Sequence, residues 1–117
     1  MAPVCLRKMP EMRTGKGPPW MNDKIKTRDT DRLCEAIVSL RSVEECYNLL
    51  EDLLTIGELQ SIAQRLAVAE MLDQGQTYDE IEQSTGASSA TISRVKRALA
   101  FGADGYRLVL DRLHGAG

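Results

Sequence analysis

The sequence predicts an all-α protein of six helices joined by very short turns. All four prolines lie before residue 20, so the longer part of the chain has no proline to break a helix. Hydrophobic residues in that part recur every three to four positions, which is the spacing of one face of an α-helix. No segment alternates between apolar and polar residues as a half-buried strand does.

Capping residues predict where the first helices begin. Asp29 or Thr30 is expected to cap the first helix. Its inner face is predicted to be Leu33, Cys34, Ile37 and Val38. Ser or Thr followed by Glu three positions later is the capping-box pattern. This pattern predicts the next three helix starts at Ser42–Glu45, Thr55–Glu58 and Thr77–Glu80.

Glycines predict where the later helices end. Gly75 is expected to close the longest helix, because a C′ residue commonly adopts a left-handed backbone. Gly86 then interrupts the chain, and a helix is predicted from about Ser89 to Phe101, stopped by Gly102. The last helix is expected to begin near Asp104 and to present an apolar face of Tyr106, Val109, Leu110 and Leu113.

Charge is distributed unevenly along a chain whose net charge is −2. Residues 1–28 carry a net +5, residues 29–76 a net −7, and residues 77–117 are balanced. The proline-rich residues 1–27 are predicted to be a disordered basic arm, or an upstream extension that precedes Met21. The folded domain is predicted over residues 28–114.

Several classes of function find no support in the composition. The three cysteines lack C-x-x-C spacing and are interpreted as structural, and the single histidine, His114, cannot build a catalytic triad or a metal cluster. We therefore expect no enzyme, no metal and no cofactor. Neither a membrane-length apolar run nor a signal-peptide h-region is found, which favours a cytoplasmic protein.

The segment Thr77–Phe101 carries the functional signal. Two short helices joined by a tight turn with glycine are typical of a helix-turn-helix. Ile81 of the first helix is expected to meet Ile92 and Val95 of the second, with the small Ala87 at the crossing. These inward positions leave an outward face that suits the DNA major groove. The candidate DNA-binding residues are Ser89, Ala90, Thr91, Ser93, Lys96 and Arg97.

The first turn of this second helix lacks an acidic residue. Three other helices have glutamate at the third position, whereas this helix has Thr91 there, so its N-terminal amides are predicted to be free for a phosphate. A homodimeric DNA-binding transcription regulator is therefore expected. The alternative, motivated by the near-neutral charge, is a helix-turn-helix bundle that serves as a protein-interaction module without binding DNA.

The chain resembles the YerC/YecD family, a branch of the Trp-repressor superfamily, from about Thr27 to Leu113. The resemblance is carried by TRDTDRLCEAIVSLRSVEECYNLLEDLLTIGEL, QSIAQRLAVAEML, TYDEIEQSTGASSATISRVKRAL and FGADGY. It implies a six-helix bundle and an intertwined homodimer, in which the first three helices and the last interlock between subunits. It also implies that the partner is double-stranded DNA and that regulation is by repression.

The resemblance further implies an effector pocket. Arg65 and Arg94 match the two arginines that hold the amino acid in the Trp repressor, and Thr55 matches a threonine at the pocket edge. Val95 and Ala98 replace a glycine and a serine of that pocket, which argues against tryptophan as the ligand. A different small-molecule co-repressor is left open, and the alternative is that Arg65 pairs with an acid in a structural bridge.

Overall fold

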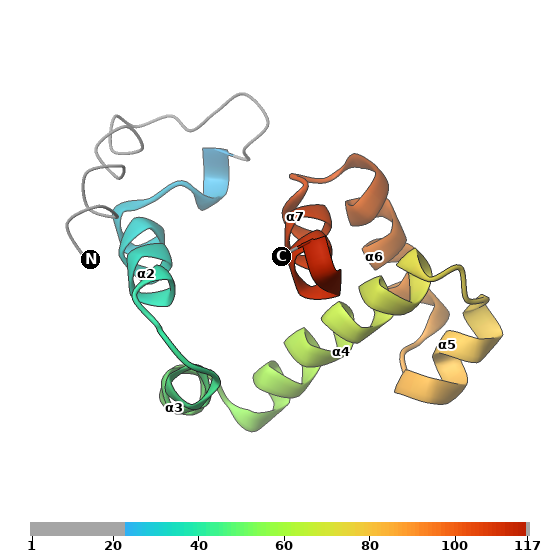
Figure 1. The fold of residues 1–117 in the computed structure, drawn as a ribbon, viewed down its shortest axis with the longest axis horizontal. Coiled ribbons are helices and arrows are strands. Elements are labelled where there is room, and N and C mark those ends of the chain that lie inside the picture. Colours follow the sequence, from blue (N-terminus) through green and yellow to red (C-terminus); the bar gives the residue numbers. More distant parts are fainter. Residues whose placement is uncertain (1–22, 117) are drawn as a thin grey trace. The chain divides into compact units, whose positions relative to one another are not determined.

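The computed structural model describes residues 23–116, and within that range it contains six α-helices and no strand (Figure 1). The prediction of an all-α fold is confirmed. The helices are α2 (Arg28–Val38), α3 (Val43–Leu53), α4 (Ile56–Asp73), α5 (Tyr78–Thr85), α6 (Ser89–Phe101) and α7 (Gly105–Asp111). A 3-10 turn η2 (Asp23–Ile25) precedes them and a π turn η3 (Arg112–Ala116) follows.

The chain divides into two compact units, one up to Leu53 and one from Leu54 onward. The first unit contributes α2 and α3, and the second contributes the other four helices. The disordered arm or upstream extension predicted for residues 1–27 lies largely outside the described residues, as does Cys5.

The start of α2 differs from the prediction. Thr27, rather than Asp29 or Thr30, is the cap: its backbone is extended and its Oγ1 accepts a hydrogen bond from the Thr30 N–H at 3.0 Å. Asp29 lies inside the first turn, where its negative charge favours the positive end of the helix dipole. An ion pair of 2.6 Å between Lys26 and Asp31 also holds the entry to this helix.

The first unit buries no residue of α2 or α3. The predicted inner face of α2 is open, with Ile37 48% exposed, and Tyr47 on α3 is 66% exposed. In both helices the apolar residues are concentrated on one side, so each helix has the amphipathic pattern on which the prediction rested. No residue of the first unit covers these faces within the described range, so the two helices have no core of their own.

The buried core lies in the second unit. It consists of residues from α4, α5, the turn after α5, α6 and α7: Val68, Ala69, Ile81, Ala87, Ile92, Val95 and Leu110. Figure 1 shows α5 and α6 at the carboxyl end of the long α4. Of the predicted apolar face of α7, only Leu110 is fully buried, whereas Val109 and Leu113 are exposed.

An ion pair joins α7 to the carboxyl end of α4. The Arg107 guanidinium donates to the Asp73 carboxylate at 2.8 Å. The hydrogen bond and the charge of Asp73 raise the pKa of Arg107 above its ordinary value. The raised pKa favours the charged form of Arg107, which the ion pair between the two helices requires.

Two of the three predicted capping boxes are complete. In the Thr55–Glu58 and Thr77–Glu80 pairs, the threonine hydroxyl accepts the glutamate N–H and the glutamate carboxylate accepts the threonine N–H. The third is altered. Ser42 Oγ accepts the Glu45 N–H, but the Glu45 carboxylate accepts the N–H of Arg41 instead of Ser42. The glutamate thus reaches one residue farther back than a capping box requires.

Glycines close α4 and α5 as predicted. After α4, Gly75 is left-handed with φ 84°, and the N–H groups of Gly75 and Gln76 donate to Leu72 and Met71. These two bonds make a Schellman motif. After α5, Gly86 is left-handed with φ 75° and its N–H donates to Glu82.

The backbone at Gly86 generates a test of the turn. Gly86→Ala should lower the free energy of unfolding by about 1–2 kcal/mol, because a Cβ disfavours the left-handed conformation. No atom lies within 4 Å of that Cβ, so the loss would be conformational and not a collision. Gly86→Asn should lose less, since asparagine tolerates this region. Urea unfolding at one fixed protein concentration measures both.

Gly57→Ala is the matched control. Gly57 lies in the first turn of α4, its φ is not left-handed, and a Cβ there would meet no atom within 4 Å. The same substitution should therefore raise the free energy of unfolding by about 0.4–1 kcal/mol, chiefly by restricting the unfolded chain. A stabilising Gly86→Ala would contradict the assigned turn geometry.

Candidate nucleic-acid interface

Helix α6 is bounded by local features of its sequence. Ser88 precedes it in an extended conformation, and its Oγ accepts a hydrogen bond from the Thr91 N–H at 3.2 Å. At the other end the Gly102 N–H donates to Ala98. A side chain at Gly102 would collide with the Ala98 carbonyl oxygen. The helix therefore has defined ends on both sides, close to those predicted.

The two faces of α6 are clearly separated. Ile92 and Val95 are buried in the same cluster as Ile81 and Ala87, which confirms the predicted packing of the helix-turn-helix. Five of the six candidate DNA-binding residues are exposed: Ser89, Ala90, Ser93, Lys96 and Arg97. The sixth, Thr91, is half-buried. The structure thus gives α6 an exposed surface of short polar side chains and three bases, the two candidates and Arg94.

The helix N-terminus is less open than predicted. Because the Thr91 N–H is bound to Ser88 Oγ, that amide is not available to a phosphate. The Ser88 hydroxyl also lies 3.2 Å from the Thr91 hydroxyl, which holds the threonine against the cap. Sequence reasoning identified the absence of glutamate in this turn but did not assign the cap to Ser88.

Helix α4 fixes the turn between α5 and α6. The Gln64 side-chain amide donates to the carbonyl of Thr85 at 3.1 Å. The Thr85 hydroxyl donates to Ile81 and accepts from the Ala87 N–H, at 2.7 and 3.1 Å. Sequence reasoning missed both residues, since a single glutamine on a long helix gives no signal of its distant partner.

The charges of α5 and α6 are opposite in kind. Asp79 and Glu80 lie in the first turn of α5, whereas α6 contains no acidic residue. Within residues 23–116, none of the α6 bases Arg94, Lys96 and Arg97 forms an ion pair. The positive charge of α6 is therefore not neutralised by a neighbouring acid of the described chain.

Tyr78 joins the two helices at this surface. The Lys96 Nζ lies 5.8 Å from the centroid of the Tyr78 ring, within the range of a cation–π contact. The Tyr78 hydroxyl is 3.4 Å from Ser93 Oγ. The sequence analysis did not single out Tyr78. The available signal was its position three residues before Ile81, which places both on the α6-facing side of α5.

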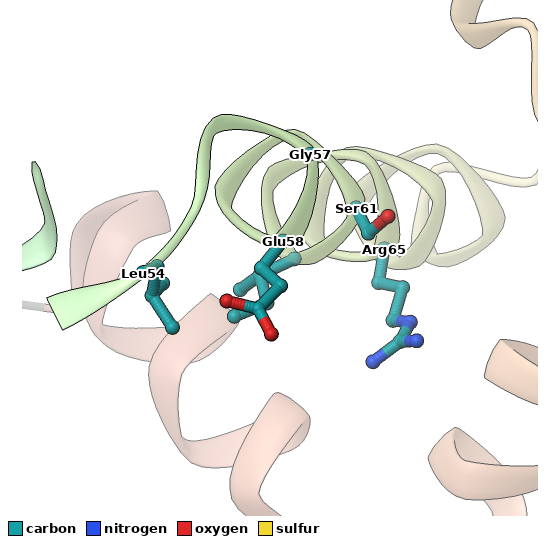
Figure 2. Close-up of a pocket in the computed structure, with 6 residues that line it drawn as sticks. Leu54, Gly57, Glu58, Ser61 and Arg65 are labelled. Carbon is teal, nitrogen blue, oxygen red and sulfur yellow. The ribbon is translucent and has the colours of Figure 1, made fainter.

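A shallow depression lies along the first three turns of α4. It has a volume of about 390 Å³ and is lined by Leu54, Gly57, Glu58, Ser61, Ile62 and Arg65. Figure 2 shows the Glu58 and Arg65 side chains extending from the same side of the helix. Arg65 forms no ion pair with an acid of residues 23–116, so the alternative of a structural bridge finds no partner there.

The other two predicted effector residues do not line this depression. The Thr55 hydroxyl accepts the Glu58 N–H at 3.1 Å and is occupied as the cap of α4. Arg94 is exposed on α6. The structure therefore associates only Arg65 of the predicted three with the depression, and the ligand role of all three stays a prediction.

Within residues 23–116, no group of histidine, cysteine and carboxylate side chains could hold a metal ion. No helix in the same range is long and apolar enough to cross a bilayer.

Known proteins resemble the chain over most of its length. The family described as Trp repressor protein matches residues 28–114. YerC of Bacillus subtilis (strain 168), described as uncharacterized, is 55% identical over 91 residues, which is 78% of this chain and 88% of YerC.

Two solved structures have the same fold. A Staphylococcus aureus protein provisionally assigned as a Trp repressor superposes with a TM-score of 0.75 at 51% identity, covering 79% of this chain and 92% of its own. A TrpR like protein from Eubacterium eligens ATCC 27750 superposes with a TM-score of 0.77 at 47% identity, covering 82% and 99%.

Proposed function

Since the chain belongs to the Trp repressor protein family, we propose that it is a sequence-specific DNA-binding transcription regulator that represses as a homodimer. The observation that carries the proposal is the division of α6. Ile92 and Val95 anchor the helix from behind, while its exposed side carries small polar residues, three bases and no acid. A helix held in this way can enter the major groove without burying charge against its own fold.

The outer residues divide into two roles. Ser89, Ala90 and Ser93 are short, so they allow α6 to approach base edges closely, and the serines can donate to or accept from them. Lys96 and Arg97 lie farther along the helix and supply the positive charge for phosphates. Thr91 is half-buried and its N–H is bound to the Ser88 cap, so its expected contribution is smaller.

A second copy of the chain is the proposed cover for α2 and α3. These helices bury no residue in one chain, and large apolar side chains on both are exposed. A closed two-fold dimer would cover these faces and set two α6 helices against two half-sites of one operator. Under this proposal residues 28–114 form one domain that is complete only in the dimer.

The proposed regulator is a non-catalytic cytoplasmic protein. Its proposed partner is double-stranded DNA and its proposed chemistry is recognition alone. DNA binding depends on the local charge of α6 and not on the net charge of −2, because salt limits the reach of exposed charges to about 10 Å.

A small-molecule effector is a second part of the proposal, motivated by Arg65. Its guanidinium lines the α4 depression without an ion-pair partner in residues 23–116. Glu58 lines the same depression, so a bound molecule would meet one positive and one negative group. This pair suits a zwitterion such as an amino acid better than a nucleotide, whose phosphates the carboxylate would repel.

The DNA-binding test uses Lys96→Ala and Arg97→Ala. Wild-type protein should select duplexes from a random-sequence library, and its affinity should fall steeply as salt rises. Each substitution should weaken binding and flatten the slope of log K against log salt by about 0.9 for every phosphate contact removed. Arg41→Ala, which removes the same charge from an exposed loop, should leave the slope unchanged. Binding that ignores salt and both substitutions would refute DNA recognition by α6.

The dimer test uses two neighbouring residues of α3. Wild-type protein should show about twice the chain mass of 13.0 kDa in light scattering. Tyr47→Glu should raise the dissociation constant about tenfold or more, because it places a charge on the apolar face. Asn48→Glu adds the same charge at the adjacent position and should change it little. A wild-type monomer at all concentrations would disprove the assembly.

The effector test is a thermal-shift screen of amino acids and nucleotides. An amino acid at one hundred times its dissociation constant should stabilise the protein by about 2.7 kcal/mol. That stabilisation should disappear in Arg65→Ala and persist in Arg112→Ala. A flat response across the panel would count against an effector and would leave the DNA-binding proposal intact.

A further inference from the structure

The amino end of α5 is negatively charged, so it would repel the phosphates of DNA. In a helix-turn-helix the first helix crosses the phosphate backbone. Here its first turn carries Asp79 and Glu80, and Glu82 follows one turn later. Glu80 is engaged, since its carboxylate accepts the Thr77 N–H at 2.8 Å, but the charge remains. A cation held next to this end of α5 would offset the repulsion.

Lys96 is a cation that contacts the first residue of this helix. Its Nζ lies over the ring of Tyr78, the first residue of α5, at 5.8 Å from the centroid. Lys96 is exposed and forms no ion pair within residues 23–116. The ring of Tyr78 is therefore the contact that selects among the many rotamers of its four-carbon side chain.

Tyr78 itself is held on two sides. Its ring packs against the buried core of the second unit. Its hydroxyl is 3.4 Å from Ser93 Oγ, on the outer face of α6. The ring is thus fixed between α5 and α6 before any ligand arrives, which makes it a rigid platform for a flexible side chain.

We propose that Tyr78 is a positioning residue of the DNA-binding surface: its ring holds the Lys96 ammonium where α6 meets the first residue of α5, at the place where a DNA phosphate is expected to pass. The proposal rests on the proposed function of α6. Tyr78 acts through Lys96, so removing the ring matters only while the lysine is present.

The first experiment uses the free protein and needs no DNA. A proton above an aromatic ring resonates upfield, so the Lys96 ε-methylene signal should lie upfield of its random-coil position. In Tyr78→Leu the signal should return to that position, and in Tyr78→Phe it should stay shifted. Lys26, which pairs with Asp31 and not with a ring, serves as the internal reference.

The second experiment is a double-mutant cycle on DNA affinity. The probe is a duplex that the wild-type protein selects from a random-sequence library. Tyr78→Leu should weaken binding about two- to fivefold, the size expected of an exposed cation–π contact. In a Lys96→Ala background the same substitution should have no further effect, and Tyr78→Phe should bind as wild type does. Leucine keeps an apolar contact with the core, and circular dichroism checks that the variant is folded.

The outcomes separate the two proposals. A wild-type Lys96 signal at the random-coil position, or an equal loss from Tyr78→Leu in both backgrounds, would overturn the positioning role while DNA binding stands. An upfield Lys96 signal in a protein that selects no duplex would overturn the proposed function instead. If Tyr78→Leu does not fold, the wild-type spectrum and Tyr78→Phe still decide the ring contact.

Discussion

The burial of Ile92 and Val95 against α4 and α5 is the constraint on which the proposed surface depends. Two positions three residues apart fix the rotation of a helix about its axis, so the outward residues of α6 follow from the inward ones. Each such aliphatic side chain contributes about 1.5–3 kcal/mol when fully buried. Ile81 and Val68 complete the contact from α5 and α4, and both are fully buried. The proposed DNA-facing surface is therefore set by the core behind it.

The same constraint explains the division of the chain. All residues that are buried within the described range belong to the second unit, which can hold α5 and α6 in place by itself. Helices α2 and α3 contribute nothing to that core. The apolar residues of α2 and α3 are concentrated on one side of each helix, yet none of them is buried. The proposed second copy of the chain would bury them. Under the proposal the units have separate tasks: the second unit presents α6, and the first joins two copies of the chain.

Sequence reasoning succeeded where the determinants are local. Capping boxes depend on residues three apart, and left-handed glycines on one residue, so Thr55, Thr77, Gly75 and Gly86 were predicted correctly. It was wrong where two nearby residues or groups can make the same local hydrogen bond. Thr27 and Thr30 both suit a helix cap, and Glu45 can reach either of two amides. The course of the backbone decides which cap residue or which amide is used, and it cannot be predicted from the residue types alone.

Contacts between helices were predicted only when hydrophobic pattern specified them. The meeting of Ile81 with Ile92 and Val95 follows from apolar spacing alone. The approach of Lys96 to Tyr78 depends on how α5 crosses α6 and on the rotamers of both side chains. The sequence pattern predicts neither the crossing nor the rotamers. Gln64, which fixes the turn at Thr85, was missed for the same reason. Thr55 shows a further limit, because its hydroxyl serves the cap of α4, a role that competes with binding a ligand.

The cap of α6 connects stability with charge at the proposed interface. Helices α4 and α5 begin with complete capping boxes, in which a glutamate supplies a second hydrogen bond. Helix α6 begins with Ser88 and has Thr91 in place of that glutamate, so it forgoes this bond. A carboxylate there would place negative charge at the end of the helix that must approach DNA, where the helix dipole otherwise favours a phosphate. A cap without a carboxylate makes one hydrogen bond fewer, but it places no negative charge at the end of α6 that is proposed to approach DNA. The acids that stabilise α5 are retained, and the Lys96 ammonium lies over the tyrosine that begins that helix.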